Sequence, residues 1–261
     1  MLGRPEIREM PTDSLEGRVA LVTGSTTGLG FAVARAMGHA GARVVLNFAH
    51  NEARAATALK ALTSIGIEAT CVQASVIDEA EVDRLCSEVE SRFGPIDIAV
   101  FNATPDQPLK PIEDYDWAFY QSMLDFFVKS PYLVTRRILP HLKEQGWGRI
   151  INIGSEVFRR GVAPFSAYVA AKGAQTGWNR SMSGELAPFG VTVNMVCPGW
   201  IPVERHDDDP QEAKDEYRAL IPVDRWGVPE DVGGICAFLA SDAAAFITGQ
   251  DVAVNGGMTV T

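Results

Sequence analysis

Residues 19–30 read VALVTGSTTGLG, a short apolar run that passes directly into a turn with three glycines. Four consecutive apolar residues are typical of a strand buried on both faces of a sheet. Glycines in the turn let the backbone approach a pyrophosphate, and the start of the following helix supplies free N–H donors. The stretch predicts a nucleotide-binding turn; a tight turn without a ligand is the alternative.

Apolar runs and helical patterns alternate along the rest of the chain. Strands that alternate with helices predict an α/β fold, a doubly wound parallel sheet with helices on both faces. We expect an N-terminal arm at 1–16, one domain at 17–261, and a lid at about 200–222. The expected strands are 19–22, 44–46, 69–73, 96–101, 150–153, 191–196 and 252–254, and the expected helices are 31–40, 51–62, 78–93, 115–144, 166–186, 211–220 and 230–239.

Composition disfavours several classes of function. The 261 residues carry 23 Lys and Arg against 33 Asp and Glu, and the net charge of −10 disfavours binding to nucleic acid or anionic lipid. The four cysteines lack CxxC spacing, and the acidic run Asp207–Asp209 is interpreted as solvated, so no metal site is expected. Neither a membrane span nor a secretory signal is recognisable, which indicates a cytoplasmic protein.

Tyr168 and Lys172 stand four residues apart in a predicted helix and therefore share one face of it. A cation about 4 Å from a phenolate is worth roughly 4 kcal/mol at an effective dielectric near 20. Before any opposing desolvation, that lowers a tyrosine pKa by up to about three units. Tyr168 is the predicted general acid/base, and Ser155 is placed to hydrogen-bond a substrate oxygen. An ordinary partly exposed Tyr–Lys pair is the alternative.

An ordered set of motifs resembles the short-chain dehydrogenase/reductase family over about residues 17–261. The resemblance implies a Rossmann-like fold and an NAD(P)-dependent oxidoreductase that interconverts a carbonyl and an alcohol on a small molecule. It implies a dimer or tetramer, and it assigns Lys172 to the nicotinamide ribose. The motifs are TGxxxGxG at 23–30, FNAT at 101–104, NIGS at 152–155, YVAAK at 168–172, CPG at 197–199, RWGVPED at 225–231, and TGQ at 248–250 with NGG at 255–257.

The same resemblance assigns a set of residues to the cofactor. These are Gly24, Ser25, Thr26, Thr27, Gly28, Leu29, Gly30, Asn47, Phe48, Ala49, Ser75, Val76, Asn102, Ala103, Tyr168, Lys172, Pro198, Gly199 and Ile201.

The end of the second strand bears on the choice of cofactor. NAD enzymes usually carry an acid there for the adenosine ribose, and this chain has Phe48. An acid would repel a 2′-phosphate, whereas Asn47, His50, Asn51 and Arg54 are potential donors to one. No Arg or Lys lies within the glycine turn itself. We therefore expect NADP(H) in preference to NAD(H).

The chain departs from the family pattern at four positions. Ser75 replaces an aspartate, Thr104 a glycine, and Val203 a threonine. Phe127 stands where the family has a catalytic asparagine; a shifted register would offer Asp125 instead. Phenylalanine cannot hold the water that links the active-site lysine to solvent. The alternative function is therefore a cofactor-binding regulator or weakly active relative.

Three residues flank the nicotinamide-side motifs and are expected to border the substrate pocket. They are Glu156, Phe158 and Trp200, with core packing as the alternative for the aromatic residues. If Glu156 faces the pocket, it disfavours an anionic substrate. Specificity is expected to reside in the lid.

Overall fold

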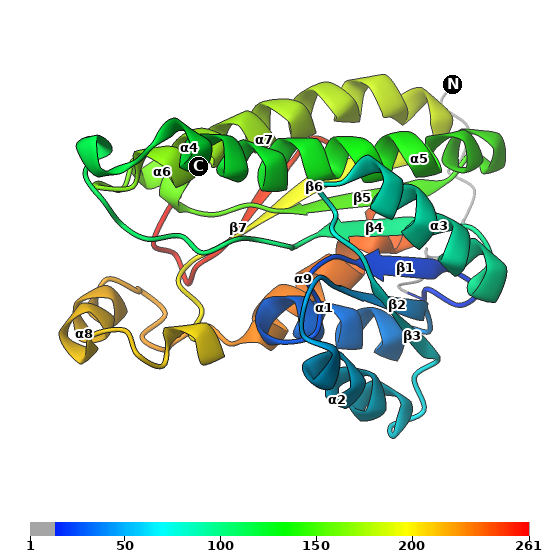
Figure 1. Ribbon diagram of the computed structural model, residues 1–261, viewed down its shortest axis with the longest axis horizontal. Helices are drawn as coiled ribbons and strands as arrows, with labels where there is room; N and C mark the ends of the chain where they lie inside the picture. The colour runs from blue at the N-terminus through cyan, green and yellow to red at the C-terminus, as the bar shows by residue number, and fades with distance from the viewer. Residues whose placement is uncertain (1–13, 261) are drawn as a thin grey trace, which may run out of the picture.

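Seven parallel strands form the central sheet of the computed structural model, which describes residues 14–260 (Figure 1). Their order, β3-β2-β1-β4-β5-β6-β7, confirms the doubly wound parallel sheet that the alternating sequence predicts. The chain changes direction across the sheet between β1 and β4, the place where ligands of such sheets bind. The strands are β1 (Val19–Val22), β2 (Arg43–Phe48), β3 (Ala69–Gln73), β4 (Ile98–Phe101), β5 (Gly148–Ile153), β6 (Val191–Pro198) and β7 (Asp251–Val254).

Helices cover both faces of the sheet (Figure 1). Successive strand residues point to opposite faces, so Ala20 and Val22 join one buried cluster, whereas Val19 and Leu21 join the other. The first cluster packs against α1 (Gly28–His39), α2 (Glu52–Thr63) and α9 (Pro229–Ala240). The second packs against α3 (Glu79–Phe93), α5 (Ser130–Gln145) and α7 (Ser166–Leu186).

The long helix expected at 115–144 is interrupted. It consists of α4 (Trp117–Leu124), a π-helical turn η2 (Asp125–Lys129) and α5. Pro131 has no N–H to donate to the carbonyl four residues before it, and the Ser130 N–H donates to the Asp125 carbonyl, five residues back. The wider turn follows from this local chemistry, and π turns of this kind are frequent at functional sites.

Shorter elements complete the fold. The lid contains η4 (Glu204–His206) and α8 (Gln211–Ala219), and the remaining short helices are α6 (Val157–Arg160), η1 (Ile112–Asp114), η3 (Ala187–Phe189) and η5 (Asp242–Ala244). Most of the expected N-terminal arm, residues 1–13, lies outside the described residues. Leu15 is buried in the core and its N–H donates to the Ala40 carbonyl at 2.7 Å. Within residues 14–260, no helix is long and apolar enough to cross a membrane.

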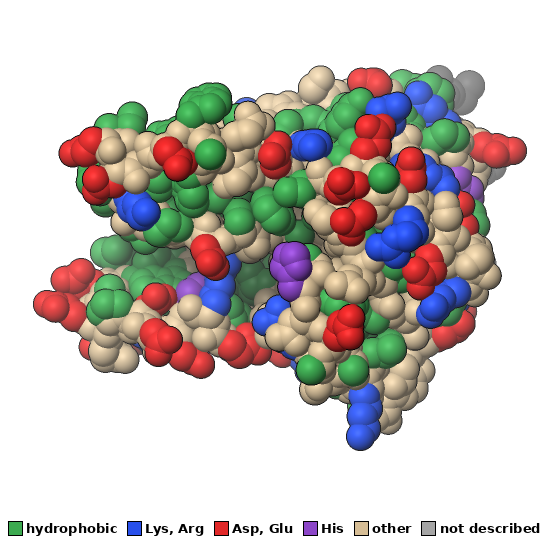
Figure 2. All heavy atoms as spheres, in the orientation of Figure 1, with side chains coloured by type: hydrophobic (Ala, Val, Ile, Leu, Met, Phe, Trp, Pro, Cys, Tyr) green, Lys and Arg blue, Asp and Glu red, His purple; other side chains and the backbone are tan. Residues whose placement is uncertain are grey.

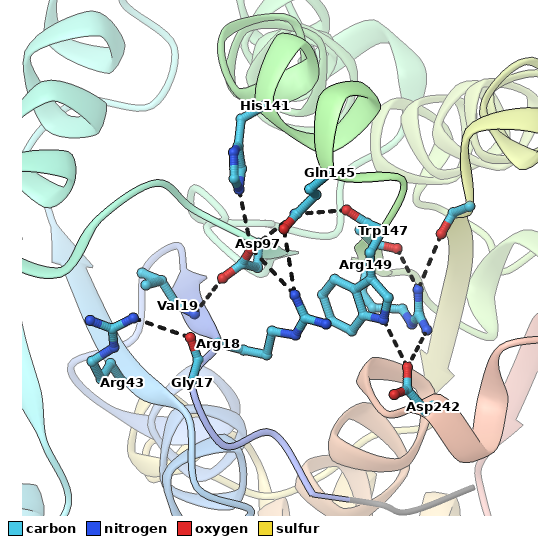
Figure 3. Close-up of polar contacts among 12 residues, drawn as sticks. Gly17, Arg18, Val19, Arg43, Asp97, His141, Gln145, Trp147, Arg149 and Asp242 are labelled. Carbon is cyan, nitrogen blue, oxygen red and sulfur yellow. Dashed lines mark hydrogen bonds and ion pairs between the residues drawn. The ribbon is translucent and has the colours of Figure 1, made fainter.

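A network of polar side chains lies at the amino ends of β1, β4 and β5 (Figure 3). The Asp97 carboxylate accepts the Val19 N–H at 2.9 Å and the Gln145 side-chain amide at 2.9 Å. Arg149, which is 1% exposed, pairs with Asp242 at 3.1 Å. The Trp147 ring lies between two guanidinium groups, with Arg18 3.6 Å and Arg149 4.2 Å from its centroid.

Candidate active site

A cleft opens at the carboxyl end of the sheet, between the α4–α6 side of the molecule and the α8 lid (Figure 2). Hydrophobic side chains line much of its interior, and charged ones gather along its rim (Figure 2). The glycine turn after β1 and the serine after β5 both lie at this end of the sheet because parallel strands share their direction. The motifs singled out in the sequence therefore meet at one edge.

The glycine turn packs closely against the chain that follows β4. Gly24 and Gly28 have φ of +59° and +54°, which side chains rarely tolerate. A Cβ at Gly24 would lie 2.8 Å from the Ala103 Cα, so the turn needs glycine for close approach. The Asn102 side-chain amide donates to the Gly24 carbonyl at 2.8 Å. Thr27 makes no side-chain cap to the first turn of α1, which leaves that turn suited to an anion.

Asn47 differs from its expected role as a donor to a cofactor phosphate. It is 2% exposed, and its side-chain amide donates to the Ala74 carbonyl at 3.0 Å. Its side-chain oxygen accepts the Gly24 N–H at 3.2 Å. These bonds use both ends of the amide, so Asn47 shapes the glycine turn from below and does not face a ligand.

Arg54 brings a cation to the glycine turn from outside it. It lies in α2, whose first residues are capped by the Asn51 side chain, and its Nε donates to Thr26 Oγ1 at 3.3 Å. Arg54 is otherwise exposed. The sequence names Arg54 as a potential donor, and the fold brings it from α2 to the glycine turn.

The predicted catalytic side chains come together after β5 and on α7. Tyr168 and Lys172 are both buried, at 8% and 2% exposure, and the Lys172 Nζ lies 5.5 Å from the Tyr168 ring centroid. Ser155 follows β5 and is close enough to Tyr168 for its hydroxyl to lower the tyrosine pKa by hydrogen bonding. A substrate oxygen placed between the two hydroxyls would meet both.

The expected direction of the Tyr168 pKa shift is wrong for this structure. Burial raises the pKa of Tyr168 to about 12, and the Ser155 hydroxyl and Arg205 offset only part of that rise. Burial also holds the pKa of Lys172 well below its usual value. The sequence argument counted the attraction between the two groups, whereas loss of solvent around them is the larger effect.

Phe127 meets Lys172 directly. The Phe127 side chain is 3% exposed, and the Lys172 Nζ lies 3.7 Å from its ring centroid, over the face of the ring. The same ring packs edge-on against Tyr168 at 5.4 Å between centroids. Asp125, the alternative residue, accepts a hydrogen bond from Gln121 at 3.0 Å and lies at the start of the π turn. An aromatic face thus contacts the lysine where the family pattern has an asparagine.

Glu156 does not offer a free carboxylate to a substrate, contrary to the expected pocket position. It is 3% exposed and accepts hydrogen bonds from Tyr217 Oη at 2.5 Å, Arg160 Nη1 at 2.8 Å and Asn255 Nδ2 at 3.2 Å. We call these four residues the lid clasp, because Tyr217 belongs to α8. The clasp joins the lid to the residue that follows Ser155.

The two aromatic candidates for the substrate pocket pack against the lid and against α7. The Trp200 ring packs edge-on against Tyr217 and Trp226, and the Trp200 backbone N–H donates to Tyr217 Oη at 2.6 Å. Phe158 is 43% exposed and its ring covers Gly173 on α7. Neither residue is shown in contact with Tyr168, so both remain predictions as substrate contacts.

The other assigned cofactor residues lie along the same edge. The Ser75 N–H donates to Glu81 at 2.8 Å, the Gly199 N–H donates to the Val254 carbonyl at 3.1 Å, and Val76 and Ile201 are buried. Their contacts with a nucleotide remain predictions.

The sequence motifs do not identify Gln175 as a neighbour of Lys172. Gln175 is 1% exposed and its side-chain oxygen accepts from the Lys172 Nζ at 3.0 Å. The signal that could have found it is its spacing: Ala171, Gln175 and Asn179 recur every four residues on the buried face of α7.

Nearly the whole chain is similar to known reductases. Residues 24–259 match the family model described as enoyl-(acyl carrier protein) reductase. The chain is 35% identical over 246 residues to the 3-oxoacyl-[acyl-carrier-protein] reductase FabG of Aquifex aeolicus, covering 94% of this chain and 98% of that protein. It is 38% identical over 250 residues to the 3-oxoacyl-[acyl-carrier-protein] reductase of Synechocystis sp., covering 95% and 99%.

A solved structure gives the same result. A protein from Agrobacterium tumefaciens, provisionally assigned as a gluconate dehydrogenase, superimposes with a TM-score of 0.89 at 31% sequence identity. The match covers 95% of this chain and 99% of that one. Sequence and fold therefore agree along nearly the full length.

Proposed function

Because the chain belongs to the short-chain dehydrogenase/reductase family, we propose that it catalyses NADP(H)-dependent reduction of a carbonyl group to an alcohol, and the reverse reaction. The observation that carries the proposal is the meeting of Ser155, Tyr168 and Lys172 beside the glycine turn. The relatives named above are reductases, which supports an enzyme over the alternative of a cofactor-binding regulator.

The residues at the sheet edge fit a dinucleotide. Gly24, Gly28 and the uncapped start of α1 would hold the pyrophosphate, and Arg54 would hold a 2′-phosphate on the adenosine ribose. NADPH, when bound, supplies a hydride to the carbonyl carbon. The protein then has to stabilise the negative charge that develops on the carbonyl oxygen.

Tyr168 and Ser155 are placed to neutralise and stabilise that charge. The Tyr168 hydroxyl donates its proton to the substrate oxygen, and the Ser155 hydroxyl donates a hydrogen bond to the same atom. A phenol whose pKa burial raises to about 12 is protonated at neutral pH, the state that reduction requires. Lys172 would hold the nicotinamide ribose of a bound cofactor and, when protonated, would add positive charge near the phenol.

A 3-oxoacyl thioester is the first substrate class to test, because the relatives from Aquifex aeolicus and Synechocystis sp. are named for it. We expect NADPH-dependent loss of nicotinamide absorbance with a 3-oxoacyl thioester, compared with simple ketones and a sugar acid. Turnover of no carbonyl or alcohol in this panel, with cofactor bound, would contradict the proposal.

Cofactor preference is tested by titration calorimetry. We expect NADPH to bind at least about tenfold more tightly than NADH, and Arg54→Ala to lose roughly that factor for NADPH alone. Arg43→Ala, a cation at the opposite end of β2, is the matched control and leaves both affinities unchanged. A tighter complex with NADH would overturn the NADP(H) assignment.

A cytoplasmic homo-oligomer, dimer or tetramer, completes the proposal. Size-exclusion chromatography with light scattering gives the mass in solution, and a monomer would remove that part alone.

A further inference from the structure

Lys172 is a buried lysine whose hydrogen-bond partners among residues 14–260 are neutral. Its Nζ donates to the Ile153 carbonyl at 2.6 Å and to Gln175 Oε1 at 3.0 Å, and it lies over the Phe127 ring. A buried ammonium is costly unless hydrogen-bonded, and burial lowers the pKa of Lys172. The neutral partners therefore determine whether the side chain carries a charge at all.

Within the part of the chain that the structure describes, Gln175 is the one side chain that accepts a hydrogen bond from the ammonium. A buried amide is costly when unpaired, so an apolar residue would fill this position in α7 more simply. Its carbonyl is directed at Lys172 because its other end is engaged: Gln175 Nε2 donates to Asn152 Oδ1 at 3.5 Å. Asn152 in turn donates to Asn179 Oδ1 at 3.0 Å.

This row of amides has one orientation. Lys172 can only donate, so Gln175 must present oxygen to it, and each amide further along presents oxygen to the previous donor. Gln175, Asn152 and Asn179 are all at most 1% exposed. The row fixes the Gln175 amide without bringing any carboxylate to the lysine.

Other ionisable groups around Lys172 do not replace Gln175. On the neighbouring elements these are Tyr168 of α7, Cys197 of β6 and Arg205 of the lid. Burial raises the pKa of Cys197 to about 11, which keeps the thiol neutral, and Arg205 repels the ammonium. On η2, Asp125 is hydrogen-bonded to Gln121 instead.

We propose that Gln175 is a positioning residue for the reaction: its side-chain carbonyl, held by Asn152 and Asn179, keeps Lys172 protonated and fixed beside Tyr168. Gln175 acts through Lys172 and touches no reacting atom. The effect on turnover rests on the proposed function, whereas the effect on the charge of Lys172 does not.

Two substitutions distinguish this role from packing. Gln175→Met keeps the volume and removes the carbonyl, whereas Gln175→Glu keeps an acceptor and adds a buried charge. A packing role makes Met the milder change and Glu the more harmful one. A positioning role predicts the reverse for kcat, with Met losing roughly tenfold to hundredfold and Glu retaining more activity than Met.

The pH profile supplies a second readout. If Lys172 loses its proton more readily in Gln175→Met, the Tyr168 phenolate loses a neighbouring cation. The acid limb of alcohol oxidation then moves to higher pH than in the wild type. Thr176→Val is the matched control, because its buried hydroxyl donates to the Lys172 backbone carbonyl and not to the ammonium's acceptors; its profile stays in place.

A third readout needs no activity. Lys172 has a lowered pKa in the folded state, so its protonation opposes folding below its unfolded pKa, and stability rises with pH above its folded pKa. Gln175→Met lowers the folded pKa further, so its loss in Tm relative to wild type is larger at about pH 6 than at about pH 10. Thr176→Val lowers Tm by the same amount at both pH values.

The outcomes separate the two proposals. An inactive wild type removes the proposed function and leaves the Tm comparison to decide whether Gln175 supports the charge on Lys172. An equal Tm loss at both pH values, or an active wild type with Gln175→Met as active and Gln175→Glu worse, overturns the inference about Gln175.

Discussion

At the amino ends of the strands the buried Asp97 and Arg149 side chains each form an ion pair, whereas at the carboxyl ends the partners of Lys172 among residues 14–260 are neutral acceptors and an aromatic face. Asp97 lies between His141 and Arg18, and Arg149 meets Asp242 (Figure 3). A charge without a counter-ion is sensitive to its surroundings, which suits proton transfer and costs stability.

The difference also appears in the backbone. At the amino end, the Asp97 carboxylate ties β4 to the start of β1 through the Val19 N–H at 2.9 Å. At the carboxyl end, the chain forms a π turn, η2, that carries Phe127 to the Lys172 ammonium. One end holds the sheet together, and the other holds side chains in place for a ligand.

The sharpest test of this contrast is Tyr168→Phe at the carboxyl end. We expect turnover to fall by about 10²–10⁴-fold, because only the proton-donating hydroxyl is removed, while cofactor affinity and Tm change little. Steady-state kinetics and titration calorimetry measure both. Tyr120→Phe is the control, since that hydroxyl bonds Ser166 in the same aromatic cluster. Retention of more than about a tenth of the rate would remove Tyr168 as the acid.

The opposite behaviour is expected of Asp97→Ala at the amino end. It leaves the Val19 N–H and the Gln145 amide without their buried acceptor, so the free energy of unfolding falls by about 3 kcal/mol. The kcat of the folded enzyme stays within about twofold. Denaturant unfolding measures the loss, and Asp242→Asn, whose carboxylate is half exposed, loses about 1 kcal/mol. A large fall in kcat for Asp97→Ala would show that the two ends are coupled.

Phe127→Leu tests the aromatic face under the ammonium. A desolvated cation–π contact is worth about 2 kcal/mol, so its removal lowers kcat by about tenfold through a less protonated Lys172. Met123→Leu, buried in the same cluster, is the control for packing alone and changes kcat little. If both variants behave like wild type, the ring is a packing group only.

Tyr217→Phe gives the smallest expected effect. It removes one donor to Glu156 from the lid clasp, which costs about 1 kcal/mol of stability and raises KM more than it lowers kcat. Thermal melting and substrate titration measure the two quantities. Tyr132→Phe, an exposed tyrosine on α5, is the control. An unchanged KM would mean that the clasp does not set the lid's position.

Much of the fold is predictable because burial leaves a strong mark on sequence. The apolar run at 19–22 and the pattern at 166–186 give β1 and α7 with their observed bounds. The break in the long helix is not predictable from a 3.6-residue period. It depends on which carbonyl the Ser130 N–H reaches once Pro131 removes a donor.

The candidate site is predictable in its residues and less so in its electrostatics. The motifs identify Ser155, Tyr168 and Lys172, but the direction of the Tyr168 pKa shift depends on how much water burial removes, which spacing does not reveal. Asn47 looks like a polar donor beside the cofactor, yet the fold turns its amide toward Ala74 and Gly24. Such side chains have several possible partners, and only the folded arrangement selects among them.

The lid clasp has a consequence for redesign of this protein. If a transplanted lid carried no hydroxyl donor at position 217, the Glu156 carboxylate would remain buried with one donor fewer. Because Glu156 directly follows Ser155, the damage would appear as lost activity toward every substrate, and a sound new pocket would be discarded as a failed design. Exchange of the lid therefore requires a donor at position 217, or a neutral residue at position 156, in the same transplant.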